Sequence, residues 1–166
     1  MLIELHEARI DEKPVLRHLI ELYQYDLSES GGTDVDADGR FGYRYLDDYW
    51  TDAGRHPFLI RVNGQLAGFV LVRRLGDENG EPMHQIAEFF IMRKYRRRGA
   101  GRSIARRVFD ALPGMWEVRE SEENAVAQAF WRRVIGEYTS GHFDETRLRS
   151  DEWRGPVQRF HSRRAR

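Results

Sequence analysis

Residues 89–103 read FFIMRKYRRRGAGRS and join three different patterns. Its first residues, 89–92, are the end of an almost continuously apolar run over residues 84–92. Such a run is typical of a strand that is buried on both faces. A strongly basic turn with two glycines follows. Apolar residues then recur at helical spacing over residues 100–112. The segment therefore predicts a buried strand, a cationic turn and the first turn of an amphipathic helix.

The start of this helix is a natural site for an anion. Its first N–H groups have no partner within the helix, and the helix dipole places partial positive charge there. Gly99 and Gly101 would let a phosphate approach the backbone and would allow φ values that other residues resist. Guanidinium groups that suit phosphate oxygens come from Arg96, Arg97, Arg98 and Arg102. The ligand that fits this arrangement is a diphosphate.

Other interpretations of the segment have less support. A Walker P-loop requires a Lys-Ser/Thr pair after its second glycine, and none is present. The dinucleotide-binding fingerprint requires three spaced glycines in an early βαβ unit. Nucleic-acid binding by the arginines is an alternative, but the run is short and is joined to a helical core stripe. A purely structural helix cap also stays open.

The chain before this segment predicts two helices and a hairpin. Asp11 can cap a helix that carries Pro14 in its first turn and continues to about residue 27. A second short helix is expected over residues 43–50, with aromatic side chains that line a pocket or pack in the core. Asn63-Gly64 separates the apolar runs 57–62 and 65–72, which is the strongest short signal for a β-hairpin.

The chain after the segment alternates strands and helices. We expect a strand over residues 115–118, a helix over residues 122–135, and strand-like pieces near 141–143 and 155–160. A polar turn is expected over residues 76–82, and the inward face of the 122–135 helix is expected to carry Ala125, Ala129, Phe130 and Ile135. The order of elements predicts one mixed α/β (α+β) domain over residues 1–166, with a frayed tail after about residue 161.

Composition sets the class of protein. The chain has 166 residues, no Cys and a formal net charge of zero. No apolar run approaches the roughly 20 residues of a membrane helix, and acids stand where a signal peptide would carry bases. The acids are concentrated before residue 93 and the arginines after it, so the two halves either neutralise each other or form a polyanion site. A cytoplasmic protein without a membrane partner is expected.

The arginine-glycine turn resembles a known family. Residues 96–101 match the Arg/Gln-x-x-Gly-x-Gly/Ala signature of the GCN5-related N-acetyltransferases (GNAT), and Tyr95-Arg96 follows the apolar strand as in that family. Residues 115–119 look like the family's next strand. The next helix carries a similar Asn-x-x-Ala-x-x-Phe-aromatic pattern, in Asn124, Ala127, Phe130 and Trp131.

The resemblance implies a fold and a cofactor. The fold would be the GNAT acyl-CoA N-acyltransferase fold, a mixed, mostly antiparallel sheet flanked by helices. Acetyl-CoA would lie in a V-shaped cleft, with its pantetheine arm along the strand residues Phe89, Phe90 and Ile91. Its pyrophosphate would rest on the backbone amides of Arg97, Arg98, Gly99, Ala100, Gly101 and Arg102. Asn124 would help to fix the pantetheine or a water, and a backbone N–H near Ile91 would be the oxyanion donor.

Catalysis in such a site requires a base for the attacking amine and an acid for the thiolate. Glu88 and Glu117 are the candidates for the base, and His84 is a weaker one. Either Glu could equally be a solvent-facing strand residue or an arginine partner. Trp131 stands where many relatives carry a tyrosine acid, and its indole has no usable acidity. Tyr138 could replace that tyrosine only if the helix extends so far.

The expected function is acetyl transfer to a primary amine, on a small molecule, a peptide N-terminus or a lysine. Without Cys, transfer would be direct within a ternary complex. The acidic N-terminal half mildly favours a cationic acceptor. The alternative that Trp131 suggests is a non-catalytic acyl-CoA sensor or interaction module. No metal and no nucleic-acid partner are expected, and the sequence is compatible with a homodimer.

Overall fold

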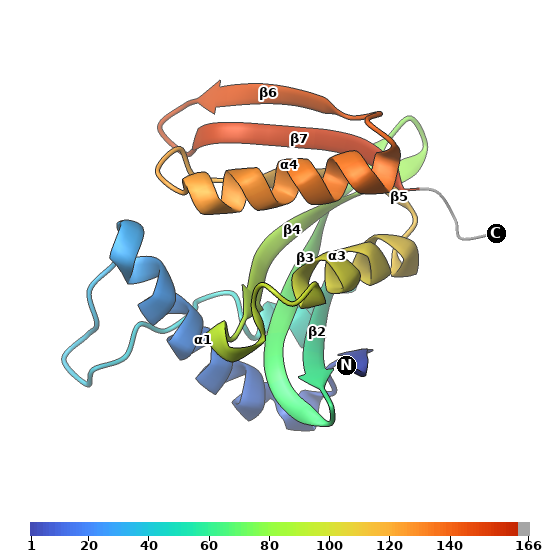
Figure 1. The fold of residues 1–166 in the computed structure, drawn as a ribbon. Coiled ribbons are helices and arrows are strands. Elements are labelled where there is room, and N and C mark those ends of the chain that lie inside the picture. Colours follow the sequence, from blue (N-terminus) through green and yellow to red (C-terminus); the bar gives the residue numbers. More distant parts are fainter. Residues whose placement is uncertain (163–166) are drawn as a thin grey trace.

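One seven-stranded sheet forms the centre of the protein (Figure 1). The structure is a computed structural model that describes residues 1–162. The strand order is β1-β2-β3-β4-β5-β7-β6, and every neighbouring pair is antiparallel except β4 with β5, which is parallel. The strands are β1 (Ile3–Glu7), β2 (Arg55–Val62), β3 (Gln65–Glu78), β4 (Glu81–Ile91), β5 (Gly114–Arg119), β6 (Asp144–Arg149) and β7 (Arg154–Ser162).

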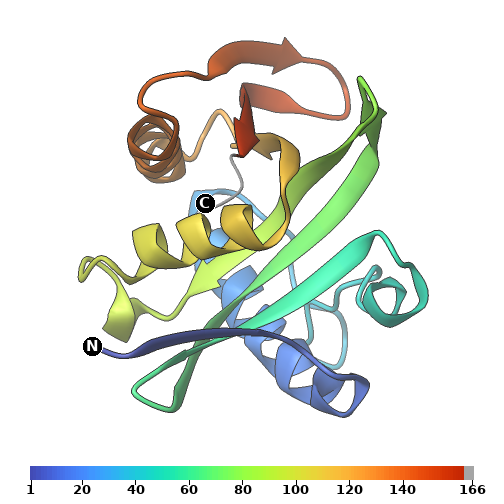
Figure 2. The ribbon, with the colours of Figure 1, turned by 90° about the vertical axis from the view of Figure 1, so that its right-hand side faces the viewer.

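Helices cover both faces of the sheet (Figure 2). They are α1 (Lys13–Leu27), the short α2 (Asp48–Thr51), α3 (Ala100–Ala111) and α4 (Ala125–Thr139), with short 3-10 turns at Ile10–Glu12, Ser28–Ser30 and Arg93–Tyr95. Neighbouring residues of β3 point to opposite faces and so build two cores. Val70 packs with the side chains of α3 and α4, whereas Phe69 packs with those of α1. The predicted fold class, a mostly antiparallel sheet flanked by helices, is confirmed.

The hairpin and the helix after the basic turn form where the sequence places them. Asn63 and Gly64 both have positive φ, 50° and 76°, as the two central residues of a type I′ turn require. Helix α3 begins at Ala100, and its predicted inner stripe is fully buried at Ile104, Ala105, Val108 and Phe109. These elements are specified by local pattern alone.

Four elements differ from the prediction. Strand β1 was missed, because its five residues gain their order from pairing with β2 rather than from their own pattern. The helix expected over residues 43–50 is only the four-residue α2, Asp48–Thr51. The turn expected over 76–82 is only Asn79-Gly80, since β3 and β4 continue on both sides of it. The strand expected near residues 141–143 begins at Asp144 instead.

The inward face of α4 also differs from the prediction. Ala125 and Ala129 are exposed, and the buried side chains are Gln128, Trp131, Val134 and Ile135. The helix begins at residue 125 rather than 122 and extends to Thr139, because Asn124 caps it and Ser140 ends it in a left-handed conformation. The expected frayed tail after residue 161 falls partly outside the described residues; β7 itself continues to Ser162.

A buried carboxyl follows β5. Glu120 is 3% exposed, and within residues 1–162 neither of its oxygens nor Gln158 Oε1 has a hydrogen-bond partner. Burial raises the pKa of Glu120 to about 8, so the group is a neutral acid at pH 7 that can donate its proton to Gln158. Gln158 in turn donates to Glu145 at 2.6 Å, and Arg132 pairs with Glu145 at 2.8 Å. The contacts of Gln158, Glu145 and Arg132 join β7, β6 and α4, and the proton of Glu120 would link them to the end of β5.

Glu120→Gln is expected to remove a pH dependence of stability. Because the pKa of Glu120 is higher in the folded state than its ordinary value of 4.5, its contribution is fully present at pH 4 and is lost as the pH rises to about 8. The variant should match the parent at pH 4 and exceed it by about 3–5 kcal/mol at pH 9, the free energy that corresponds to a pKa shift from 4.5 to about 8, measured by urea unfolding. Glu152→Gln, at an exposed position, is the control. Equal stability of the Glu120 variant and the parent at both pH values would contradict the assignment.

Candidate functional site

The parallel strands β4 and β5 separate after only three paired positions. Met83, His84 and Gln85 pair with Met115, Trp116 and Glu117, and no later residue of β4 pairs with β5. Residue 86 and residues 88–91 continue to pair with β3 on their other side. This part of β4 therefore presents a strand edge that no other strand covers, and it contains the predicted pantetheine residues Phe89, Phe90 and Ile91.

A β-bulge in β4 decides which way Glu88 faces. The register with β3 shifts between Leu71, opposite Glu88, and Val72, opposite Ile86, so Ala87 is the extra residue. Ile86 and Phe89 pack in the core beneath α3 and α4, whereas Ala87 packs in the core beneath α1. The bulge thus turns Glu88 toward the α1 face, at the level where β4 and β5 have separated.

Two tyrosines hold the Glu88 carboxylate. Tyr23 of α1 donates to Glu88 Oε2 at 2.5 Å, and Tyr43, from the loop before α2, donates to Glu88 Oε1 at 3.3 Å. Burial raises the pKa of Glu88 above its ordinary value, against the lowering effect of the two hydroxyls and of Arg73. A half-buried carboxylate whose pKa is raised and which neutral donors hold in place is suited to accept a proton.

Glu117, the other candidate base, is placed differently. It is fully buried, and its carboxylate accepts from Gln85, Arg119 and Arg159 at 2.6–2.9 Å. Despite the burial, the two guanidinium groups hold its pKa below the ordinary value. Both oxygens are occupied, so this geometry favours an ionised, positioning carboxylate over a proton acceptor.

His84 is buried at the paired end of β4. It is 5% exposed, and its ring lies against Trp116 with centroids 5.2 Å apart. Burial lowers the pKa of this imidazole. It lies before the point at which the strands separate, away from Glu88.

The aromatic side chains of α4 belong to the core. Trp131 is 5% exposed, and its ring lies 5.0 Å from both Phe89 and Phe130. Helix α4 extends far enough to include Tyr138, but the hydroxyl of Tyr138 donates to Asp110 of α3 at 2.7 Å. Burial and that carboxylate raise the pKa of Tyr138. Tyr138 lies seven residues beyond Trp131, about 10 Å along the helix, and its position does not favour it as the acid.

The basic turn presents a set of unpaired amides. Arg97 and Gly99 have positive φ, 61° and 80°, and Gly99 precedes the first residue of α3. Within the described part of the chain, no backbone or side-chain acceptor is bonded to the N–H groups of residues 97–102; the next amide, that of Ser103, donates to Gly99 at 3.1 Å. The six amides that the resemblance implies for the pyrophosphate thus have no acceptor within the described part of the chain.

The arginines of the turn have different partners. Arg96 pairs with Asp26 of α1 and donates to the Ile91 carbonyl at 2.6 Å, and Arg102 pairs with Glu137 of α4 at 3.2 Å. Their guanidinium groups are used within the protein, contrary to the expectation that all four bind phosphate. Arg97 and Arg98 are exposed and have no carboxylate within ion-pair distance among residues 1–162. These two are the guanidinium groups that a phosphate can recruit.

Gly101 packs closely against Phe130 of α4 and Ile91 of β4. A Cβ at this position would lie 3.1 and 3.2 Å from ring atoms of Phe130 and 3.4 Å from Ile91 Cδ1. A Cβ at Gly99 would meet nothing within 4 Å, but its φ of 80° favours glycine. The expectation that Gly101 leaves space for a phosphate is corrected: its missing side chain lets α3 approach α4 and β4.

Gly101→Leu is expected to destabilise the protein by about 1–3 kcal/mol, because the side chain overpacks the contact with Phe130. Gly99→Ala should cost about 1 kcal/mol, the conformational cost of a positive φ without a clash. Urea unfolding of both variants measures the difference. If the two variants were equally stable, the space between α3 and Phe130 would be large enough for a leucine side chain, and the prediction would be wrong.

Asn124 acts first as a helix cap. Its Oδ1 accepts from the Ala127 amide at 3.0 Å at the start of α4. The sequence does not single out Tyr23 and Tyr43 as site residues, although it leaves open that the aromatic residues near 43–50 line a pocket. In the sequence, Tyr23 stands at an inward position of the first helix and Tyr43 in the loop that follows. Packing in the core explains both positions equally well.

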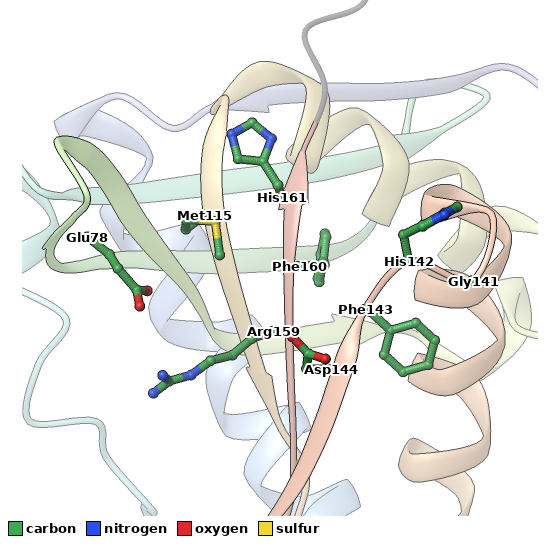
Figure 3. A pocket seen from close by; sticks show the side chains of 9 residues that line it. All are labelled: Glu78, Met115, Gly141, His142, Phe143, Asp144, Arg159, Phe160 and His161. Atoms are coloured by element: carbon green, nitrogen blue, oxygen red, sulfur yellow. The ribbon is translucent and has the colours of Figure 1, made fainter.

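A hollow of about 590 Å³ lies elsewhere, beside β7 (Figure 3). It is lined by Glu78, Met115, Gly141, His142, Phe143, Asp144, Arg159, Phe160 and His161. In Figure 3 Arg159 and Phe143 lie on opposite sides of β7. Glu88 and the α3 turn do not contribute to it. No helix within residues 1–162 has the length and apolar character needed to cross a membrane, and no group of three or more His, Asp or Glu in that part is arranged to hold a metal ion.

Comparisons with known proteins agree with this architecture. A GNAT acetyltransferase from Staphylococcus aureus is 16% identical over 98% of this chain and 100% of that chain, with a TM-score of 0.66. An acetyltransferase from Thermus thermophilus gives the same identity and TM-score over 97% of both chains. The PaiA N-acetyltransferase from Thermoplasma acidophilum, solved with coenzyme A, is 10% identical over 97% and 99%, with a TM-score of 0.61.

A comparison with curated proteins gives no match. The family model described as the acetyltransferase (GNAT) family matches residues 16–136, most of the chain, including β4, the basic turn and α4 up to residue 136. The chain therefore belongs to the GNAT acetyltransferase family.

Proposed function

We propose that the protein is an acetyl-CoA-dependent N-acetyltransferase that acetylates a primary amine directly, with Glu88 as the general base. One observation carries the proposal. The separation of β4 from β5 leaves a free strand edge that has the Glu88 carboxylate at one position and leads into the six unpaired amides of the α3 turn. A thioester co-substrate with a diphosphate requires both features.

The residues that would hold acetyl-CoA fit the group. The amides of residues 97–102 suit the pyrophosphate, with Arg97 and Arg98 beside them. The free edge formed by Phe89, Phe90 and Ile91 suits an extended arm that pairs as a strand would. Asn124 is proposed to contact the pantetheine arm, or a water beside it, through its Nδ2 group, because its Oδ1 already caps α4.

The chemistry is divided between the co-substrate and the protein. Acetyl-CoA supplies the acetyl thioester. Glu88 accepts the proton of the attacking amine, while Tyr23 and Tyr43 keep the carboxylate oriented toward the α1 face. Glu117 is proposed as a residue that positions arginines, and Tyr138 is left out of the mechanism. The departing thiolate takes its proton from water.

The second candidate is a non-catalytic acyl-CoA-binding module. Trp131 favours it, because its buried indole occupies the position of the usual tyrosine acid. Both candidates require binding of the coenzyme, and only the first requires turnover.

The test combines binding with turnover. Acetyl-CoA is expected to raise the melting temperature in proportion to its occupancy, and free thiol should appear when an amine panel is added. A thermal shift without thiol release for any amine would support the non-catalytic module. The absence of a shift would refute both candidates.

A further inference from the structure

A row of polar side chains crosses the sheet on the face that Glu88 shares, and it runs from Arg55 of β2 to Asp144 of β6. Arg73 of β3 is opposite Gln85 of β4, Gln85 is opposite Glu117 of β5, and Glu117 is opposite Arg159 of β7. Opposite residues of neighbouring strands point to the same face. The row therefore crosses the sheet at the last position where β4 and β5 still pair.

A single buried carboxylate ties the row together. Glu117 is fully buried and accepts from Gln85 Nε2 at 2.8 Å, from Arg119 Nε at 2.6 Å and from Arg159 Nε at 2.9 Å. Gln85 connects Glu117 to Arg73, because its Oε1 accepts from Arg73 Nε at 2.6 Å. Three guanidinium groups are thus fixed through their Nε atoms, which leaves terminal N–H groups of Arg73 and Arg119 for other partners.

The positive charge of this cluster exceeds its negative charge. Within residues 1–162, no carboxylate other than Glu117 lies within ion-pair distance of the three arginines. Arg119 and Arg159 share the one carboxylate of Glu117, Asp144 of β6 lies opposite Arg159 without forming an ion pair, and Arg73 has no carboxylate within ion-pair distance among these residues. The cluster is accessible, because the side chains of Arg119 and Arg159 are 29% and 51% exposed. Rigid, half-exposed guanidinium forks are suited to a carboxylate or phosphate.

The cluster lies next to the proposed base. Glu88 follows Gln85 by three residues, about 10 Å along the strand. Arg73 is close enough for its charge to lower the pKa of Glu88. Arg119 lies two residues beyond Glu117, on the part of β5 that has separated from β4. An amine at Glu88 can therefore carry an anionic group that reaches the arginines.

We propose that Arg73, Arg119 and Arg159 form an acceptor subsite for an anionic group, so that the acceptor is a primary amine that also carries a carboxylate or a phosphate. Glu117 is then the positioning residue that fixes the forks. The proposal rests on the proposed function and specifies its acceptor. It also argues against an acceptor whose second group is cationic, because the side chains next to Glu88 in this cluster are arginines.

The experiment compares matched acceptors. 4-Aminobutyrate and its amide differ only in the anionic group, and phosphoethanolamine and ethanolamine form the phosphate pair. With acetyl-CoA present, kcat/KM should be about 10- to 100-fold higher for the anionic member of one pair, the value of a charge-assisted contact. The pair with the larger ratio distinguishes a carboxylate from a phosphate. Ratios near one for both pairs would overturn the proposal.

Variants locate the effect. Arg73→Gln removes a charge without exposing Glu117, and Arg119→Lys keeps a charge but loses the fork; each should reduce the acid-to-amide ratio about 5- to 10-fold. Any change in Glu88 affects both members of a pair and cancels in the ratio. Arg133→Gln, on the exposed surface of α4, is the matched control and should leave the ratio unchanged. Retention of the ratio in both cluster variants would overturn the assignment.

Calorimetric titration of the same ligands into the protein separates the two proposals. If no amine is acetylated, the transferase proposal fails, but tighter binding of 4-aminobutyrate than of its amide, lost in Arg73→Gln, still supports the anionic subsite. Equal affinity of acid and amide, and of phosphoethanolamine and ethanolamine, would refute the subsite even if amines are acetylated.

Discussion

Glu88→Gln is expected to lower kcat by about 100- to 1000-fold, the usual contribution of a general base. Gln keeps the shape of the side chain and can still accept from Tyr23, so the hydrogen bond to α1 and the packing of β4 persist. What is lost is the ability to take a proton from the amine. The measurement is the rate of thiol release at saturating acetyl-CoA, with the melting temperature confirming that the variant is folded.

The pH profile separates this role from a structural one. Because burial raises the pKa of Glu88, kcat/KM of the parent should rise with pH through a value above the ordinary range of a glutamate. In Glu88→Gln this rise should disappear, while any rise caused by the amine itself remains. Glu81→Gln changes an exposed glutamate of the same strand and should leave both kcat and the profile unchanged.

Two outcomes would count against the base. A variant with parental kcat would exclude Glu88 from the proton transfer. A lower kcat with an unchanged pH profile would show that the residue acts through packing.

The stability of the protein should also respond to Glu88. Its pKa is raised in the folded state, so its contribution is present at low pH and decreases as the pH rises through the folded value. Glu88→Gln removes that decrease in the same way as Glu120→Gln.

The sequence predicts the parts of the fold that depend on neighbouring residues. Asn63-Gly64 is sufficient for the hairpin, since both residues accept positive φ. The apolar spacing of residues 104–109 is sufficient for the buried face of α3. Strand β1 depends instead on β2, its partner some 50 residues away, and the sequence pattern does not show that pairing.

The site is less predictable because its geometry depends on long-range contacts. Simple alternation along β4 would place Ala87 and Glu88 on opposite faces, and the bulge overrides it. Glu117 is held by Arg159, which is distant in the sequence and becomes its neighbour only through the pairing of β5 with β7. The glycines of the turn look equivalent in the motif, yet only Gly101 is in contact with Phe130.

Arg102→Pro is expected to weaken binding of acetyl-CoA about 10- to 100-fold, whereas Arg102→Ala should change it little. Both variants lose the guanidinium group, which pairs with Glu137 rather than lying free. Only proline also removes the backbone N–H, one of the six amides without an acceptor in the described part of the chain. The difference between the two variants is therefore the contribution of a single amide to phosphate binding.

The substitution is compatible with the helix. Arg102 is the third residue of α3, where the amide makes no intrahelical bond, so proline costs little there. The preceding residue is Gly101, which has no Cβ to clash with the proline ring. The chain already carries a proline in the first turn of α1, at Pro14. Equal affinities of the two variants, measured by titration with acetyl-CoA while unfolding shows equal stability, would mean that the turn does not hold the diphosphate.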